Sequence, residues 1–126
     1  MKIPFFDVTR QYEQCKEEIG SIVADVLQSG SFIGGKYVRD FEERMADYLG
    51  VKHVLTCGNG TDALELALQS IGVGPGDEVI TTPFSFFATS EAIAAVGAIP
   101  VFGDIRLSDL NLDPATIEAR ITEKTK

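Results

Sequence analysis

The fold is decided by a short stretch in the middle of the chain, Cys57-Gly58-Asn59-Gly60-Thr61-Asp62-Ala63. A short β-branched run precedes it from residue 53, and apolar side chains at helical spacing follow it to residue 71. The stretch therefore predicts a strand that ends in glycines and passes directly into a helix. In open α/β sheets, such junctions lie at the carboxyl ends of parallel strands.

The alternation of strands and helices continues along the chain. Strands are expected at residues 53–57, 78–82 and 98–102, and helices at residues 61–71, 88–96 and 114–121. Two successive strand-helix-strand units need long crossovers, which join parallel neighbours. The predicted fold class is α/β, with a three-strand βαβαβ parallel unit. Since parallel sheets are normally larger, the sheet looks unfinished, and another strand is expected near residues 124–126.

Two helices are expected before this unit. Apolar residues recur at helical spacing from about residue 11 until Gly30, and again over residues 36–49 until Gly50. The predicted organisation is thus an amino-terminal helical segment, residues 1–50, and a partial α/β domain, residues 51–126.

The glycine-rich link between the two helices nearly spells a P-loop over residues 30–37. Tyr37 replaces the serine or threonine that binds magnesium, and a helix precedes the link instead of a strand. Hydrolysis of nucleoside triphosphates is therefore rejected. The link is expected to be a flexible connector in which Phe32 and Tyr37 pack against their surroundings.

Composition excludes several classes of partner and site. The 126 residues carry 19 acidic and 11 basic side chains, a net charge of -8, so neither nucleic acid nor an anionic membrane is an expected partner. Cys15 and Cys57 form no paired motif, and His53 is the only histidine, so no metal site is expected. The first residues lack the apolar core of a secretion signal, and a cytoplasmic protein is expected.

The glycine junction is also the best candidate for an anion site. The backbone amides of Gly60, Thr61 and Asp62 and the Thr61 hydroxyl lie where a helix start binds phosphate. Helix capping by Asn59 or Thr61 explains the same residues equally well. A phosphate also requires the Asp62 carboxylate to point away, and that carboxylate can instead complement the helix dipole.

A dinucleotide site is a competing interpretation of this junction. Gly58, Gly60 and Ala63 satisfy the Gly-x-Gly-x-x-Ala pattern between a strand and a helix. The acidic residue that should hold the ribose is wrongly placed, because Glu78 opens the second strand instead of ending it. A nicotinamide-binding domain therefore stays open as an alternative.

Aromatic side chains follow the second strand. Phe84, Phe86 and Phe87 come directly after Pro83, at the strand edge where the anion site is expected, and Asp104 follows the third strand at that edge. A flat conjugated ligand can stack on one of these rings. The alternative is that the rings belong to the core, which is plausible for any one of them but less so for all three.

Several motifs occur in order along the chain: Gly34-Gly35, Phe41-Glu42, Asn59-Gly60-Thr61-Asp62-Ala63-Leu64, Gly74-Pro75-Gly76-Asp77-Glu78-Val79-Ile80, Ala88-Thr89 and Asn111-Leu112-Asp113-Pro114. With them, the chain resembles the amino-terminal third of the nucleotide-sugar aminotransferases, the DegT/StrS group of pyridoxal 5'-phosphate (PLP) enzymes of fold type I. The resemblance covers essentially the whole chain. It implies that residues 51–126 begin the PLP-binding large domain of that fold.

The resemblance also implies site residues and an activity. Gly60, Thr61 and Asp62 would bind the coenzyme phosphate, and Phe86 would stack on the pyridine ring. Such enzymes move an amino group from an amino acid, commonly glutamate, to a nucleotide-linked keto sugar, in cell-surface polysaccharide or amino-sugar biosynthesis. They are usually homodimers. The motifs are most similar to enzymes that aminate carbon three of an N-acetylated uronic-acid sugar.

The chain departs from the family in one respect: the Schiff-base lysine, the aspartate that pairs with the pyridine nitrogen and the small domain all lie beyond residue 126. No catalytic residue is therefore assigned, and the chain is expected to be a fragment without transaminase activity of its own. A non-catalytic phosphate-binding or coenzyme-binding module is the alternative from a different class.

Overall fold

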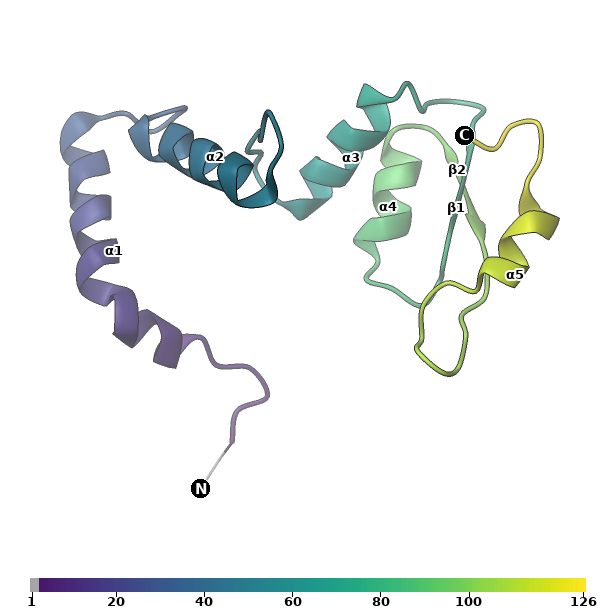
Figure 1. The fold of residues 1–126 in the computed structure, drawn as a ribbon, viewed down its shortest axis with the longest axis horizontal. Helices are drawn as coiled ribbons and strands as arrows, with labels where there is room; N and C mark the ends of the chain where they lie inside the picture. The colour runs from purple at the N-terminus through teal and green to yellow at the C-terminus, as the bar shows by residue number, and fades with distance from the viewer. Residues whose placement is uncertain (1–2) are drawn as a thin grey trace. The chain divides into compact units, whose positions relative to one another are not determined.

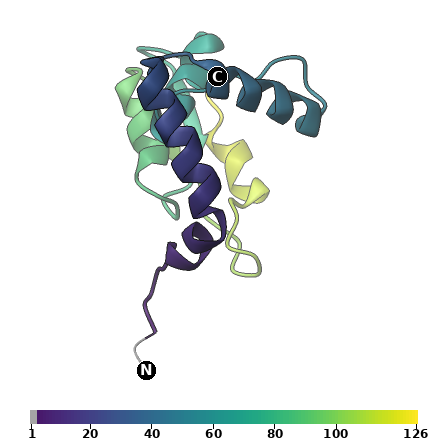
Figure 2. The same cartoon turned by 90° about the vertical axis from the view of Figure 1, so that its left-hand side faces the viewer.

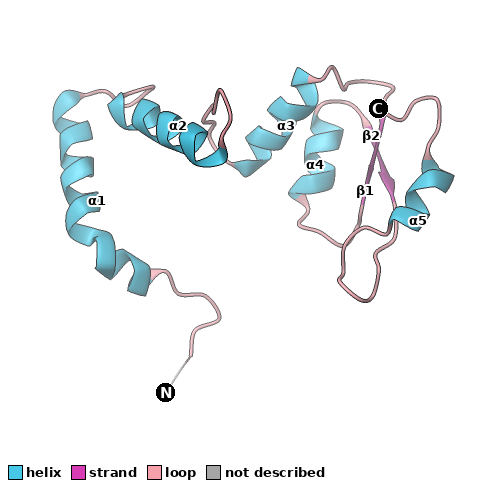
Figure 3. Cartoon of the chain, viewed as in Figure 1, coloured by secondary structure: helices cyan, strands magenta, loops and turns pink. Residues whose placement is uncertain are grey.

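A computed structural model describes residues 3–126, which form two compact units that meet between Thr56 and Cys57. The first unit is helical and the second contains the sheet (Figure 3). The α/β class predicted from the alternating pattern is confirmed. Within the described residues, no helix is long and apolar enough to cross a membrane.

The first unit consists of helix α1 (Thr9–Ser29), a short connector and helix α2 (Lys36–Leu49) (Figures 1 and 2). Both helices end where a glycine was expected to stop them, since Gly30 and Gly50 adopt left-handed backbone angles with φ of 65° and 66°. α1 begins two residues before the predicted start, where Asp7 accepts a hydrogen bond from the Thr9 amide. Neither helix contains a buried residue.

The first predicted strand is absent, and the expectation of three parallel strands at residues 53–57, 78–82 and 98–102 was wrong in this respect. Residues 53–57 belong to no helix or strand and pair with no other strand among residues 3–126. The amide and the hydroxyl of Thr56 both donate to the Glu42 carboxylate, each over 2.8 Å. A β-branched run becomes a strand only beside a partner strand, and here the Thr56 amide alone among the described backbone groups of the run is bonded, to a side chain.

The second unit contains α3 (Gly60–Ser70), β1 (Glu78–Thr81), α4 (Ala88–Ala95) and β2 (Ile99–Phe102). The two strands are parallel, with Glu78 opposite Ile99 and Thr81 opposite Phe102. Glu78 also forms a single parallel bridge with Thr125, through its amide and carbonyl. Because both backbone groups of one residue point to one side, Thr125 lies on the edge of β1 opposite to β2. A third chain segment thus joins the sheet at the place where a further strand was expected.

The core of the second unit is small. Its buried residues come from α4, from the link between α4 and β2, and from the link between α3 and β1: Val73, Ala88, Ala92, Ile93 and Ala98. Leu68 of α3, Val79 of β1 and Val96 pack against this cluster. α3 and α4 therefore lie side by side, and α4, which contacts both strands, begins near the end at which β1 finishes (Figure 1).

The last helix is shorter than expected. α5 (Pro114–Ile117) begins at Asp113, whose carboxylate caps it by accepting from the Ala115 amide, and a 3₁₀ turn (Glu118–Arg120) follows. The Arg120 guanidinium donates to the carbonyls of Phe102 and Thr116. The bond to Phe102 ties the 3₁₀ turn to the end of β2, and the bond to Thr116 spans one helical turn.

Candidate functional site

The glycine junction forms the start of α3. Asn59 is extended and caps the helix, because its side-chain oxygen accepts a hydrogen bond of 3.0 Å from the Asp62 amide. The Ala63 amide donates to the Asn59 carbonyl. The amides of Gly60 and Thr61 have no acceptor within residues 3–126. The cap therefore uses the Asp62 amide, and the amides of Gly60 and Thr61 remain without a partner and could accommodate an anion.

Asp62 turns back toward the chain that precedes the helix. A Cβ atom placed on Gly58 would lie 2.5 Å from one of its carboxylate oxygens, so a glycine at this position makes room for the side chain. The carboxylate thus lies beside the first turn of α3, where a negative charge complements the helix dipole. A phosphate bound to the Gly60 and Thr61 amides would meet this charge at short range.

The loop between β1 and α4 carries the three aromatic side chains. Phe84, Phe86 and Phe87 expose 60%, 82% and 71% of their surface, so none of them belongs to the core in this structure. The loop leaves the carboxyl end of β1, as the strand pattern predicted. It therefore presents rings to solvent at the sheet edge where ligands of parallel α/β proteins bind.

Glu78 and Asp104, the two acidic residues that the sequence placed near the candidate site, have structural roles. Glu78 opens β1, and its carboxylate accepts from the Thr122 hydroxyl, so no acidic side chain of β1 stands at the carboxyl end of that strand. The dinucleotide interpretation loses its ribose partner for this reason. Asp104, after β2, accepts a bond of 2.8 Å from the neighbouring Ile105 amide.

The lysines are exposed. Lys16 pairs with Glu13, and Lys126 bonds to the Gly72 carbonyl and lies 3.4 Å from Asp77. The Gly74 amide, and secondarily Lys126, hold the pKa of Asp77 below its ordinary value. The lysines at positions 36, 52 and 124 are exposed as well. None of the five described lysines has the desolvated surroundings that a catalytic amine needs.

With this geometry in place, comparison with known proteins is informative. The sequence model of the DegT/DnrJ/EryC1/StrS aminotransferase family matches residues 13–126. The chain belongs to this family. The resemblance drawn from the ordered motifs is thereby confirmed.

Relatives from this family match nearly the whole chain. It is 53% identical to a pleiotropic regulatory protein of Geobacillus stearothermophilus, over 100% of this chain and 34% of the relative. It is 45% identical to the UDP-2-acetamido-2-deoxy-3-oxo-D-glucuronate aminotransferase of Pseudomonas aeruginosa, over 98% of this chain and 34% of that enzyme. The chain thus spans about a third of the length of the curated relatives that it matches.

Solved structures of family members share the fold. DesV of Streptomyces venezuelae, in complex with a ketimine intermediate, superposes with a TM-score of 0.94 at 37% identity, over 99% of this chain and 34% of DesV. NtdA of Bacillus subtilis, with the bound cofactor PMP (pyridoxamine 5'-phosphate), gives a TM-score of 0.93 at 38% identity, over 99% of this chain and 29% of NtdA. The solved neighbours therefore include coenzyme-bound aminotransferases.

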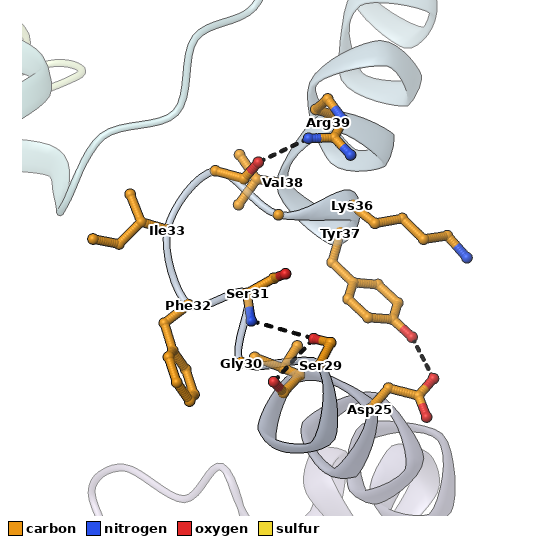
Figure 4. Close-up of a pocket in the computed structure, with 13 residues that line it drawn as sticks. Asp25, Ser29, Gly30, Ser31, Phe32, Ile33, Lys36, Tyr37, Val38 and Arg39 are labelled. Atoms are coloured by element: carbon orange, nitrogen blue, oxygen red, sulfur yellow. Dashed lines mark hydrogen bonds between the residues drawn. The ribbon is translucent and has the colours of Figure 1, made fainter.

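The connector between α1 and α2 encloses a separate hollow of about 690 Å³ (Figure 4). The Tyr37 hydroxyl donates to the Asp25 carboxylate over 2.8 Å, and this bond to the protonated phenol raises the pKa of Tyr37. Arg39 donates to the Gly34 carbonyl. Tyr37 is anchored as expected, whereas Phe32 is 68% exposed instead of packed.

Sequence reasoning missed the side chains that tie the backbone near the site. Glu42 bonds to Thr56, and the Ser85 and Thr89 hydroxyls share a hydrogen bond of 3.0 Å. The i,i+4 spacing of two hydroxyl residues around the start of a helix is the signal that points to the second pair. The first pair joins residues 14 positions apart and has no local signal.

Proposed function

We propose that this chain is the coenzyme-binding beginning of a PLP-dependent aminotransferase, which moves an amino group from an amino acid, glutamate, to a nucleotide-linked keto sugar. The observation that carries the proposal is the match to the family over residues 13–126, combined with two free amides at the start of α3. The role of the described residues is to bind and orient the coenzyme, and residues 51–126 form the beginning of the coenzyme-binding domain.

The residues present fit the phosphate of the coenzyme. Gly60 and Thr61 offer backbone amides, the Thr61 hydroxyl adds a donor, and a Cβ atom on Gly60 would meet nothing within 4 Å, so the approach is open. The Asp62 amide would join them only after the Asn59 cap opens. When bound, the coenzyme supplies the electron sink for amino transfer, and the protein supplies binding and orientation.

The aromatic loop fits the ring of the same group. Phe86 is the most exposed of the three phenylalanines, and its ring is free to stack on a flat conjugated ligand. We assign Phe86 to the pyridine ring and the start of α3 to the phosphate. Both features belong to the second unit, and the aromatic loop leaves the carboxyl end of β1, where ligands bind in parallel sheets.

For the acceptor, we propose a sugar aminated at carbon three, an N-acetylated uronic acid linked to a nucleotide, as part of polysaccharide or amino-sugar biosynthesis. Support comes from the relative of Pseudomonas aeruginosa, whose name specifies a 3-oxo-D-glucuronate. We further propose a cytoplasmic homodimer. The net charge of -8 argues against nucleic acid and anionic membranes as partners.

The phosphate assignment is tested by calorimetry of pyridoxamine 5'-phosphate (PMP) with the 126-residue chain, because PMP cannot form a Schiff base with the exposed lysines. We expect Thr61→Ala to weaken binding about tenfold to a hundredfold, the usual effect of one hydrogen bond to a charged group. Ser70→Ala, at the other end of α3, is the matched control, since that hydroxyl bonds only to the Ala67 carbonyl. Absence of PMP binding, or equal affinity in Thr61→Ala, would overturn the assignment.

A non-catalytic coenzyme-binding module is a second candidate, favoured by the exposure of all five described lysines. The two functions differ in turnover by a protein of the relatives' full length, whereas neither predicts turnover by this chain alone. The 126-residue chain with PLP, glutamate and a nucleotide-linked 3-keto sugar is expected to give no amino sugar. Turnover by this chain would exclude the module.

A further inference from the structure

The loop that carries the exposed rings is held by hydroxyl groups. The Thr82 hydroxyl accepts a bond of 3.1 Å from the Phe84 amide. The Ser85 and Thr89 hydroxyls share a hydrogen bond of 3.0 Å, and the Thr89 amide donates to the Phe86 carbonyl, also over 3.0 Å. Thr89 therefore holds the residue that bears the ring and the residue before it.

These hydrogen bonds order the backbone of a loop whose aromatic rings have little packing around them. A ring that is 82% exposed has little packing around it, so its direction depends on the backbone that carries it. A loop that is already ordered loses less conformational entropy when a ligand binds. The backbone of the next residue, Phe87, is held in a similar way, because the Ser90 hydroxyl donates to the Phe87 carbonyl.

We propose that Thr89 is a positioning residue for the Phe86 ring and acts through the Ser85 hydroxyl and the Phe86 carbonyl. The inference rests on the proposed function, in which Phe86 stacks on the coenzyme ring. Thr89 itself touches no ligand in this scheme. Its two bonds set the direction in which the aromatic ring meets a flat ligand.

The first test needs no ligand. In Thr89→Val, the side chain keeps its shape but loses the hydroxyl, so the bond to Ser85 disappears and the amide bond remains. We expect nuclear magnetic resonance of the free chain to show a changed χ1 rotamer population for Phe86. Thr89→Ser should restore the original population, since serine keeps the hydroxyl. An unchanged Phe86 rotamer in a folded Thr89→Val chain would overturn the proposal.

The second test uses PMP and distinguishes effects on ring stacking from effects on phosphate binding. Thr89→Val should weaken PMP binding on the order of threefold and reduce the induced circular dichroism per bound PMP, with affinity for inorganic phosphate unchanged. Thr61→Ala should lower both affinities and leave the dichroism per bound PMP unchanged. In a Phe86→Ala background, Thr89→Val should have no further effect on PMP. A persisting effect there would contradict positioning through Phe86.

The two proposals fail separately. If the unmodified chain does not bind PMP, the proposed function fails, while the rotamer of Phe86 in the free chain still decides whether Thr89 positions the ring. If PMP binds and Thr89→Val leaves the Phe86 rotamer unchanged, the positioning role alone is wrong.

Discussion

At the scale of single residues, the start of α3 combines a helix cap with two backbone amides that the cap leaves free. Asn59 takes the Asp62 amide, and the Asp62 carboxylate folds back toward Gly58. Two amides and one hydroxyl remain for a phosphate. The arrangement stabilises the free helix start by means of a negative charge that a bound phosphate would also provide.

A prediction follows for Asp62. Asp62→Asn removes the negative charge but keeps the backbone amide that Asn59 caps and a side chain of similar size. Since like charges at short range oppose binding, we expect affinity for PMP to rise about threefold to tenfold at low salt, with a smaller gain at high salt. Calorimetry at two ionic strengths measures this change.

Asp47→Asn, in α2, is the control for the change in net charge and should leave affinity nearly unaltered. An unchanged or lower affinity in Asp62→Asn would show that the carboxylate does not face the bound phosphate.

At the scale of elements, residues 53–57, which precede α3, are bonded to a side chain and not to a neighbouring strand. The Glu42 carboxylate of α2 accepts from both the amide and the hydroxyl of Thr56. The backbone bond, and then the hydroxyl bond, lower the pKa of Glu42 from its ordinary value of 4.5. This contact therefore depends on pH in a defined direction.

The Glu42–Thr56 contact should stabilise this segment at neutral pH and weaken in acid. A carboxyl group with a lowered pKa in the folded state contributes stability above its ordinary pKa, and this contribution is lost as pH falls through the lowered value. We expect the Thr56 amide to be protected from hydrogen exchange at pH 6 and to lose this extra protection as pH falls below about 4.5. In Glu42→Gln the pH dependence should disappear, because the amide oxygen does not titrate.

Glu43→Gln is the matched control in the next position of the helix. Protection of Thr56 that is equal in all three proteins across this pH range would contradict the role of Glu42.

At the scale of the whole molecule, apolar surface is unevenly buried. The five buried apolar residues all lie in the second unit, and three of them are alanines. α1 and α2 have no buried residue. The stability of the second unit therefore depends on few side chains.

Ile93 is the clearest test of this point, since it is 3% exposed at the centre of the core cluster. Ile93→Ala should lower the free energy of unfolding of the second unit by about 2 to 4 kcal/mol, through lost burial and the cavity left behind. Urea denaturation followed by circular dichroism measures the loss. Leu66→Ala, at a side chain that is 55% exposed, should cost far less. Similar costs at both positions would mean that the cluster is not the core.

Local signals in the sequence determined much of this protein. The glycines at positions 30 and 50 end both helices where expected, because the left-handed angle is a property of the residue itself. The helical periods of α3 and α4 and the strand pattern of β1 and β2 also act locally, so their bounds agree with prediction to within one residue. The ordered motifs were sufficient for the family.

Only the tertiary structure decided the features that need a partner distant in sequence. Residues 53–57 have the composition of a strand, but strands require a neighbour, and Glu42 took the bonds of Thr56 instead. Arg120, which lies in the 3₁₀ turn at residues 118–120, reaches the Phe102 carbonyl of β2, a contact that needs a partner 18 positions away. The direction of Asp62 and the exposure of the phenylalanine rings depend in the same way on what surrounds them. Local propensity thus defined the elements, while pairing and side-chain contacts decided how their ends were used.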